Sequence, residues 1–378
     1  MKSRMQQSWY SSPSHDSTVQ GVELVKGRNM RRFFTVYTFL LFTGLGVRAN
    51  AQEKQPLRLV QTISIPDIQG RIDHMDADVE GQRLFVAGLE NGSLEVVDLA
   101  AGKRVRSIPG FKMPTGVYYV PEFDKLFVAS LDGTVKVFHG NSLDLIDSIK
   151  LEIGVNRVMY DPATKVLYVG YGGKDAGFNY GRVGIIDARS DRYLGGDKIT
   201  EAHPSEILVD NTAQRILVSN ALADRVYVFD ALNRQPILTW RTLGKWPADM
   251  ALDQTRRRLF VGTRTPPEMT VYDSDSGQEV ASLPTVEGMD GVYYDAHLKR
   301  IYVSGGGVGY QGASKEVGGG SLFVYQQKDA DHYEPIGKVP VRGGAGTSHW
   351  VPGLNRYFVA APAHDKQEAA ILVFEPQP

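Results

Sequence analysis

Ionisable and polar residues recur at equivalent positions of a repeated segment, and their types suit ligand binding or acid–base chemistry. They stand ten and eleven residues before the aliphatic residue of a short phrase that returns along the chain. The members with an ionisable or amide side chain are Asp73, His74, Asn156, Arg157, Glu206, Asp249 and Asp290, with His203 just before the fourth pair and His349 two positions into the seventh. Such side chains, if brought together, can bind a polar ligand or transfer protons.

Three of these residues are candidates for catalysis, namely His74, His349 and Glu206. Acidic groups placed close together raise the pKa of at least one of them, which is one route to a general acid. The two histidines with Asp73 or Asp290 could also hold a divalent metal. No spacing in the sequence specifies such a site, so metal and cofactor stay undetermined.

A structural role is the alternative for the same residues. Arg157 could neutralise Glu206 or Asp249 in an ion network that binds nothing. Polar side chains at the end of a solvated channel often have no other role, so the sequence leaves both readings open.

These residues are aligned by a repeated phrase of five residues: a basic residue, an aliphatic residue, a residue that is usually aromatic, Val and a small residue. The first copy reads Arg83-Leu84-Phe85-Val86-Ala87. The other copies begin at Lys125, Leu167 (without the basic residue), Arg215, Arg258, Arg300 and Arg356. Successive copies lie 41 to 56 residues apart. Seven β-rich repeats of this period are typical of a β-propeller.

Each repeat reads as four short strands. Runs of Val, Ile, Phe and Tyr are bounded by Gly and Asp, and helical periodicity is absent. Before the phrase stands a turn residue, which is Asp78, Asp161, Asp210, Asp253 or Asp295 in five repeats and Val120 or Val351 in the others. We therefore expect an all-β, seven-bladed β-propeller of four-stranded antiparallel blades, whose first strands line the channel and start at one mouth.

The last repeat lacks its fourth strand. The segment Ser64-Ile65-Pro66 before the first repeat matches the fourth-strand endings Ser107-Ile108-Pro109 and Ser282-Leu283-Pro284. We expect residues 57–66 to complete the last blade and close the ring, which removes the free ends that an open array must cap.

Three long loops are expected on the same face as the candidate residues, at residues 170–181, 304–320 and 361–370. The first two are rich in Gly and carry Tyr180 and Tyr310, which we add to the candidate ligand contacts. Such loops either fold over a bound ligand or are insertions without function.

The N-terminal segment resembles an export signal. Arg31-Arg32 precedes an apolar run over 33–47, which is short for a membrane span, and Ala49-Asn50-Ala51 is a typical cleavage site. We expect a signal peptide at 30–51, cleavage near Ala51-Gln52, and one propeller domain over 52–378. Residues 1–29 are either an over-long start, with translation beginning at Met30, or an unusual leader; a short membrane anchor is the alternative to cleavage.

Composition narrows the function classes. The chain has no Cys, which excludes disulfides and thiolate chemistry. Of 42 Lys/Arg and 43 Asp/Glu, residues 1–51 hold seven and two, so the remainder has a net charge of −6. This balance disfavours a nucleic-acid partner. We expect a monomer in the periplasm or outside the cell, without a membrane span in the mature chain.

The repeats resemble the YncE-like, or YVTN-repeat, family of secreted bacterial seven-bladed propellers. The resemblance covers residues 57–378 and rests on second strands such as Ile301-Tyr302-Val303-Ser304 and on third-strand endings such as Val271-Tyr272-Asp273-Ser274. It implies architecture but no shared catalytic motif. Related seven-bladed families include lactonases and streptogramin lyases, in which polar residues at the channel mouth act on a ring ester.

The sequence thus favours a binding propeller that holds a small molecule or an envelope protein at one channel mouth. An enzyme of the lactonase or lyase type, with or without a metal, is the first alternative. A structural or envelope interaction protein is the second, and fold alone does not decide among them.

Overall fold

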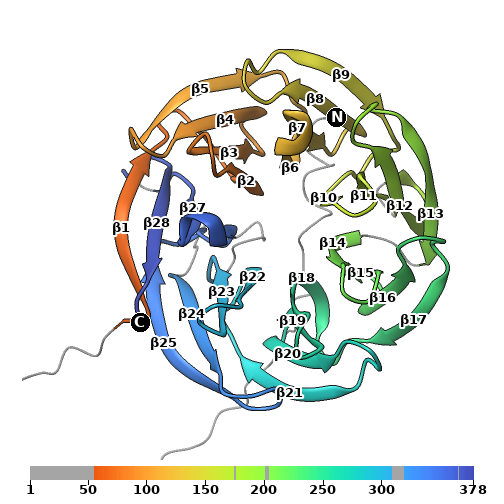
Figure 1. Cartoon of the computed structure of the whole chain (residues 1–378). Helices are drawn as coiled ribbons and strands as arrows, with labels where there is room; N and C mark the ends of the chain where they lie inside the picture. The colour runs from red at the N-terminus through yellow and green to blue at the C-terminus, as the bar shows by residue number, and fades with distance from the viewer. Residues whose placement is uncertain (1–54, 174–175, 201–203, 309–318, 365) are drawn as a thin grey trace, which may run out of the picture. The chain divides into compact units, whose positions relative to one another are not determined.

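Strands make up most of the structure, a computed structural model that describes residues 55–173, 176–200, 204–308, 319–364 and 366–378. Within the unit Gln55–Pro378, the described residues form seven four-stranded antiparallel sheets that stand around a common axis (Figure 1). The fold is the predicted seven-bladed β-propeller. No helix in the described part of the chain has the length and apolar character needed to cross a membrane.

Within each blade the four strands lie side by side, in order from the axis to the rim. We number the blades 1 to 7, beginning with the blade that contains β2. The inner strands are β2 (Met75–Asp78), β6 (Pro114–Val120), β10 (Val158–Asp161), β14 (Pro204–Asp210), β18 (Lys245–Asp253), β22 (Met289–Asp295) and β26 (Ser348–Val351). The second strands are β3 (Arg83–Gly88), β7 (Lys125–Ser130), β11 (Val166–Gly172), β15 (Arg215–Asn220), β19 (Arg258–Thr265), β23 (Arg300–Gly305) and β27 (Arg356–Ala361).

The outer half of each blade follows the same order. The third strands are β4 (Ser93–Asp98), β8 (Thr134–His139), β12 (Tyr180–Asp187), β16 (Arg225–Asp230), β20 (Pro267–Asp273), β24 (Gly320–Gln327) and β28 (Ala370–Pro376). The outer strands are β5 (Lys103–Pro109), β9 (Leu145–Lys150), β13 (Tyr193–Thr200), β17 (Pro236–Arg241), β21 (Glu279–Pro284), β25 (Tyr333–Val341) and, in blade 7, β1 (Leu57–Ser64).

The second strands form the core because both of their faces are covered by neighbouring blades. In β3, Leu84, Phe85, Val86 and Ala87 are all fully buried. A strand packed on both sides carries a continuous apolar run rather than an alternating one. The apolar run within the repeated phrase is therefore explained by packing on both faces of the second strand.

The predicted turn residues close the turns between the inner and second strands. The buried Asp78 carboxylate accepts a hydrogen bond from the Gly81 backbone N–H at 2.8 Å. The same kind of bond is made by Asp161, Asp210, Asp253 and Asp295. After Val120 and Val351, 3₁₀ turns take the place of the Asp turn, η1 (Pro121–Phe123) and η3 (Pro352–Leu354).

In five blades the basic residue that opens the phrase ties its blade to the next one, whereas Arg356 of blade 7 contacts Glu375 of its own blade. Arg83 Nη1 donates to the Gly140 carbonyl of blade 2 at 2.7 Å, and Arg258 Nη2 contacts the Asp331 carboxylate of blade 6 at 2.8 Å. We call such a contact a blade latch. The other latches are Lys125–Asp191, Arg215–Asp275 and Arg300 with the Gln377 carbonyl. Blade 3 has Val166 at this position, and a small void lies between blades 3 and 4.

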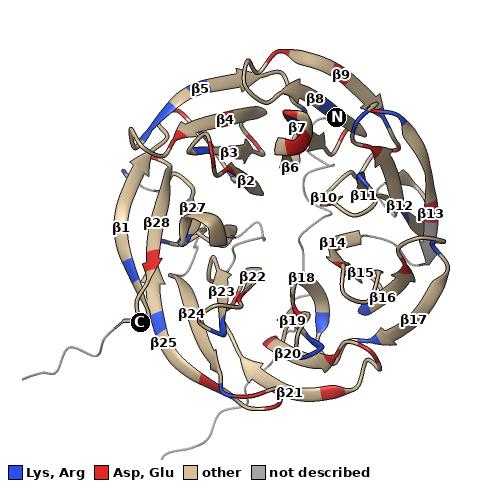
Figure 2. Ribbon diagram, viewed as in Figure 1, with Lys and Arg blue, Asp and Glu red and all other residues tan. Residues whose placement is uncertain are grey.

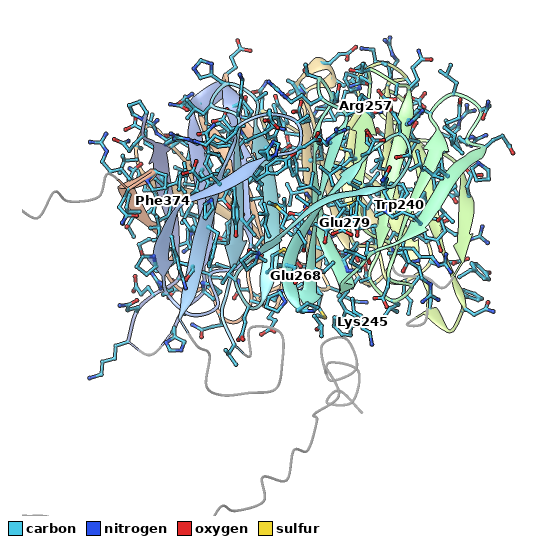
Figure 3. All side chains as sticks on the ribbon, turned by 90° about the horizontal axis from the view of Figure 1, so that it is seen from below. Trp240, Lys245, Arg257, Glu268, Glu279 and Phe374 are labelled. Carbon is cyan, nitrogen blue, oxygen red and sulfur yellow. The ribbon has the colours of Figure 1, made fainter. Side chains whose placement is uncertain are left out.

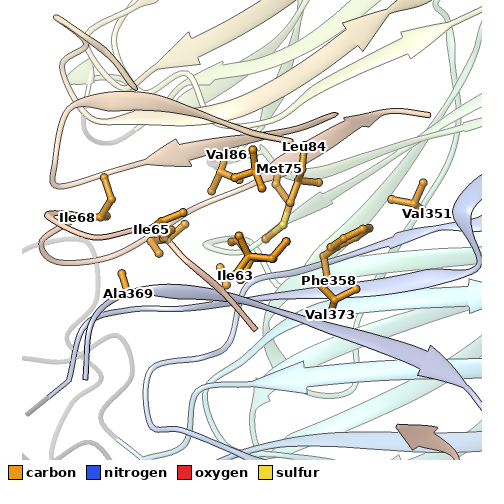
Figure 4. Close-up of a cluster of buried hydrophobic side chains, with 14 residues drawn as sticks. Ile63, Ile65, Ile68, Met75, Leu84, Val86, Val351, Phe358, Ala369 and Val373 are labelled. Carbon is orange, nitrogen blue, oxygen red and sulfur yellow. The ribbon is translucent and has the colours of Figure 1, made fainter. Parts of the chain in front are cut away.

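The N-terminal strand closes the ring, as predicted for residues 57–66. Strand β1 pairs antiparallel with β28, from Leu57 opposite Pro376 to Ser64 opposite Ala370. Apolar side chains from β1, blade 1 and blade 7 then pack into one cluster (Figure 4). Its members include Ile63, Ile65, Ile68, Met75, Leu84, Val86, Phe358 and Val373. The predicted leader (1–29) and signal peptide (30–51) lie outside the described residues.

Candidate functional site

The inner strands begin on one face of the propeller, which we call the mouth face. Figure 3 places Lys245, at the start of β18, at this face and Arg257, in the turn after β18, at the opposite one. Because the second strand runs back antiparallel to the inner strand, the loops between second and third strands open on the mouth face as well. The predicted residues at the starts of the inner strands are thus positioned by the same topological rule in every blade.

Five predicted residues from the described part of the chain join one network at this face. They are Asp73, His74, Arg157, Glu206 and Asp290. Three more residues complete it, namely Arg71 and Arg264, which were not predicted, and Thr347, which stands at the aligned position of the seventh repeat. The network connects blades 1, 3, 4, 5, 6 and 7, and we call it the mouth network.

Arg157 links three blades. Its Nε donates to Glu206 Oε1 at 2.8 Å and its Nη2 contacts Oε2 at 2.6 Å, so the ion pair with blade 4 is bidentate. Its Nη1 lies 2.5 Å from His74 Nδ1 of blade 1. The side chain therefore reaches past blade 2. Gly116 of that blade lies so close to the backbone of blade 3 that a Cβ there would be 2.7 Å from the Asn156 carbonyl oxygen.

The contact with Arg157 fixes the protonation of His74. A guanidinium only donates, so the imidazole Nδ1 must accept and the ring proton must sit on Nε2. His74 Nε2 in turn faces Asp73 Oδ1 at 3.5 Å. Burial and then the neighbouring Arg157 hold the pKa of His74 well below its usual value, in agreement with a neutral ring.

Asp290 occupies the centre of the other half of the network. It contacts Arg264 Nη2 of blade 5 at 2.5 Å and Arg71 Nη2 of blade 1 at 3.5 Å, and it accepts a hydrogen bond from the Thr347 hydroxyl of blade 7 at 3.0 Å. Arg71 also approaches Asp73 at 3.6 Å. Two guanidinium groups and two carboxylates thus share the charge on this side.

Glu206 and Asp249 form a neighbouring pair of buried acids. Their exposed fractions are 1% and 4%. Burial raises the pKa of Glu206 well above its usual value, Arg157 opposes this rise, and Asp249 adds to it. Asp249 itself accepts the backbone N–H groups of Met250 at 2.8 Å and Val292 at 2.9 Å. One proton held by the pair would relieve the repulsion between the two carboxylates.

Burial also perturbs Asp73. It raises the pKa of this carboxyl to about 6, with Arg71 as the largest opposing influence. Since perturbed pKa values are common at functional sites, Asp73 and Glu206 make the mouth network a candidate for proton transfer as well as for binding.

His349 lies beside the network rather than in it. Its Nε2 is 3.3 Å from Asp76 Oδ1, and the other Asp76 oxygen accepts the Tyr119 backbone N–H at 2.7 Å. The ring stands edge-on to Tyr293 with centroids 5.8 Å apart. His349 is 22% exposed and His74 is 15% exposed, so His349 is the more accessible of the two histidines predicted as catalytic.

The other predicted contacts have separate surroundings. Asn156 is half-buried and donates its backbone N–H to Gly170. Tyr180 stacks on Phe178 at 5.0 Å and lies under Arg182, both in its own blade. His203 and Tyr310 lie outside the described residues.

The suggested divalent metal finds no donor set in the described part of the chain, where no three His, Asp or Glu side chains converge as ligands. The surroundings of His74 give a reason. Its Nδ1 lone pair faces a guanidinium, and its Nε2 carries the proton, so neither nitrogen is directed at a cation site.

The alignment of the repeats did not identify four of the residues at the mouth, namely Arg71, Asp76, Arg264 and Tyr293. Two of them follow from strand geometry, because Asp76 and Tyr293 stand two residues after an aligned position and so share its side of the strand. Arg264 lies beyond the phrase, where β19 continues to Thr265. Only an explicit search at alternate positions and strand ends would have found these residues.

Comparison with known proteins supports the fold and leaves the family open. No protein-family model matches the chain, and no curated protein matches it. A chain from the "Crystal Structure of Mitotic Checkpoint Complex" superposes with a TM-score of 0.67 at 13% identity, covering 93% of this chain and 99% of that one. Matches extend over 1721 solved chains, so the architecture is too widespread to assign an activity.

Proposed function

We propose that this chain is a binding propeller that holds a small polar ligand or a partner protein at the mouth face. The mouth network is the observation that supports the proposal. It concentrates buried charges from most blades at one end of the axis, although burying ion pairs costs desolvation energy and apolar residues of the same size would often be at least as stable. Retaining such a network favours a role in recognition.

The first test is a thermal-shift screen of organic acids, sugars and nucleotides against the full chain. A compound bound at the mouth should raise the melting temperature of the wild type and of His332→Gln, whose side chain is 78% exposed in another part of the fold. It should lose this effect in His349→Gln. Compounds that stabilise all three proteins equally would locate binding elsewhere, and a screen without any stabilising compound would count against a small ligand.

The resemblance to YncE-like propellers extends the proposal to an exported protein. The apolar run at 33–47 and the sequence Ala49-Asn50-Ala51 support cleavage before Gln52. Mass spectrometry of the protein from the periplasm should then find a chain that begins at Gln52. A cytoplasmic chain that begins at Met1 or Met30 would contradict export.

One observation favours the lactonase- or lyase-like alternative. Burial raises the pKa of Glu206, which favours the protonated acid, and that acid could donate its proton to the leaving oxygen of a cyclic ester. Hydrolysis of simple lactones by the wild type, lost in Glu206→Gln with the fold intact, would support catalysis. Equal rates for both proteins would exclude Glu206 as the acid.

A further inference from the structure

A second polar region on the mouth face lies at the junction of blades 6 and 7, and it shares no residue with the mouth network. An open hollow there is lined by Arg342, His364, Lys366 and Gln367. Arg342 follows β25 of blade 6, and the other three belong to the loop between β27 and β28. Each of these side chains can donate N–H bonds, which is the chemistry of an anion site.

Arg342 is the central residue because its charge has no acidic partner in the described part of the chain. Its Nη1 donates to two backbone carbonyls, of Pro362 at 3.2 Å and of Glu368 at 2.6 Å. Burial lowers the pKa of this guanidinium. A half-buried cation held only by carbonyls is electrostatically incomplete, and an anion would complete it.

The same two bonds orient the guanidinium. They use both hydrogens of Nη1, so the edge formed by Nε and Nη2 is the one left for a ligand. That edge presents two parallel N–H donors, which match the two oxygens of a carboxylate or a phosphate.

The loop between β27 and β28 contributes a second cation, Lys366, to the hollow that Arg342 lines. His364 and Gln367 exchange backbone hydrogen bonds at 3.1 and 2.9 Å, which places the exposed Lys366 within a tight turn. The Glu368 carboxylate is engaged elsewhere, since it accepts a hydrogen bond from the Ser64 hydroxyl at 2.8 Å. Asp365 lies outside the described residues.

We propose that this hollow binds the oxyanion, carboxylate or phosphate, of a small ligand, with Arg342 as the bidentate donor and Lys366 as a second cation. The site is independent of the function proposed for the mouth network. It gives the mouth face an anchor for an acidic group at its periphery.

Isothermal titration of the full chain with inorganic phosphate and with acetate, at constant ionic strength, tests the proposal. The wild type should bind at least one of the two saturably, and the preferred anion identifies the oxyanion class. Arg342→Gln should weaken binding about tenfold or more, because a charge-assisted bidentate contact is lost. Lys366→Ala should weaken it less, and Asp365→Asn should not weaken it.

Two controls keep the result specific. Lys112→Ala removes a cation that is 82% exposed and belongs to the link between β5 and β6 on the same face, so it should leave binding unchanged. His349→Gln should also leave it unchanged, which separates this site from the ligand site proposed at the channel mouth, where His349 lies beside the mouth network. No saturable binding of either anion, or an equal loss in Lys112→Ala and Lys366→Ala, would overturn the proposal; Lys366 is exposed, so its variant tests the site even if Arg342→Gln does not fold.

Discussion

At the scale of single residues, Asp73 ionises differently in the folded and the unfolded chain. Burial raises its pKa from 3.8 to about 6, so the folded state holds the proton more tightly and loses stability as the pH rises from about 4 to about 6. Asp73→Asn, which cannot ionise, should therefore raise the free energy of unfolding above pH 6 by at most about 3 kcal/mol and change it little at pH 4. Urea denaturation at the two pH values measures the difference.

The matched control is Asp67→Asn. The Asp67 side chain is 91% exposed, so this variant should differ little from the wild type at either pH. An Asp73→Asn effect of the same size at pH 4 and above pH 6 would mean that ionisation of this carboxyl is not its cause.

His74 offers a spectroscopic prediction. Because Arg157 Nη1 donates to Nδ1 at 2.5 Å and burial lowers the pKa of the ring, the imidazole should stay neutral, with its proton on Nε2, when the pH falls through 6. Nitrogen-15 chemical shifts of the ring measure both properties. Protonation of His74 in this pH range would contradict the geometry.

Part of this residue chemistry could be predicted from the sequence. The ion pair between Arg157 and Glu206 was one of the two expected, because both residues align at the start of neighbouring inner strands. The contact between Arg157 and His74 could not be predicted, since it joins blades 3 and 1 and depends on how closely the ring brings them together. The mouth network has the properties of both alternatives, ion network and candidate site.

At the scale of elements, the blade latches explain why the phrase opens with a basic residue. Arg258→Ala removes the contacts with the Ala330 carbonyl at 3.1 Å and with Asp331 at 2.8 Å, which join blade 5 to blade 6. It also removes the contact with Asp273 of its own blade at 2.8 Å. We expect a loss of about 1–2 kcal/mol in the free energy of unfolding, with the lower value favoured because Asp331 is 58% exposed. Chemical denaturation measures it.

Lys328→Ala is the matched control for the latch. Lys328 pairs with Glu334 inside blade 6, and both side chains are more than half exposed. Its loss should cost less than that of Arg258. If the two variants are equally destabilised, contact between blades contributes no more than an ordinary surface ion pair.

The sequence predicts strands and turns far better than latches. Apolar runs and Asp turns depend on neighbouring residues, whereas Arg215 and Arg258 reach partners 60 and 73 residues away. The period of the repeat identifies the neighbouring blade. It does not identify which turn atom a long, flexible side chain contacts.

At the scale of the whole molecule, the N-terminal strand β1 holds blades 7 and 1 together, and we call this contact the seal. Ile63 is fully buried in the cluster that joins these blades, whereas Leu59 on the same strand is 50% exposed. Ile63→Ala should lower the free energy of unfolding by about 2–4 kcal/mol, and Leu59→Ala by much less. A melting temperature equally affected by both variants would show that the seal does not rest on this cluster.

The distribution of charge over the ring agrees with the composition. Figure 2 shows Lys and Arg as well as Asp and Glu on several sides of the propeller. A partner recognised by the whole surface is therefore less expected than one recognised by a local site. This favours the mouth network and the Arg342 hollow over a nucleic-acid interface.

Ring closure also determines how long β1 must wait for its partner strand during protein synthesis. Arg58 of β1 and Glu375 of β28 are contact partners that stand 317 residues apart, so the first strand of the propeller is made long before its partner exists. At about 5–20 residues per second, the wait is roughly 15–60 s. Throughout that time the backbone edge of β1 that pairs with β28 has no native partner, and a chaperone that holds unfolded segments would bind there earliest and longest.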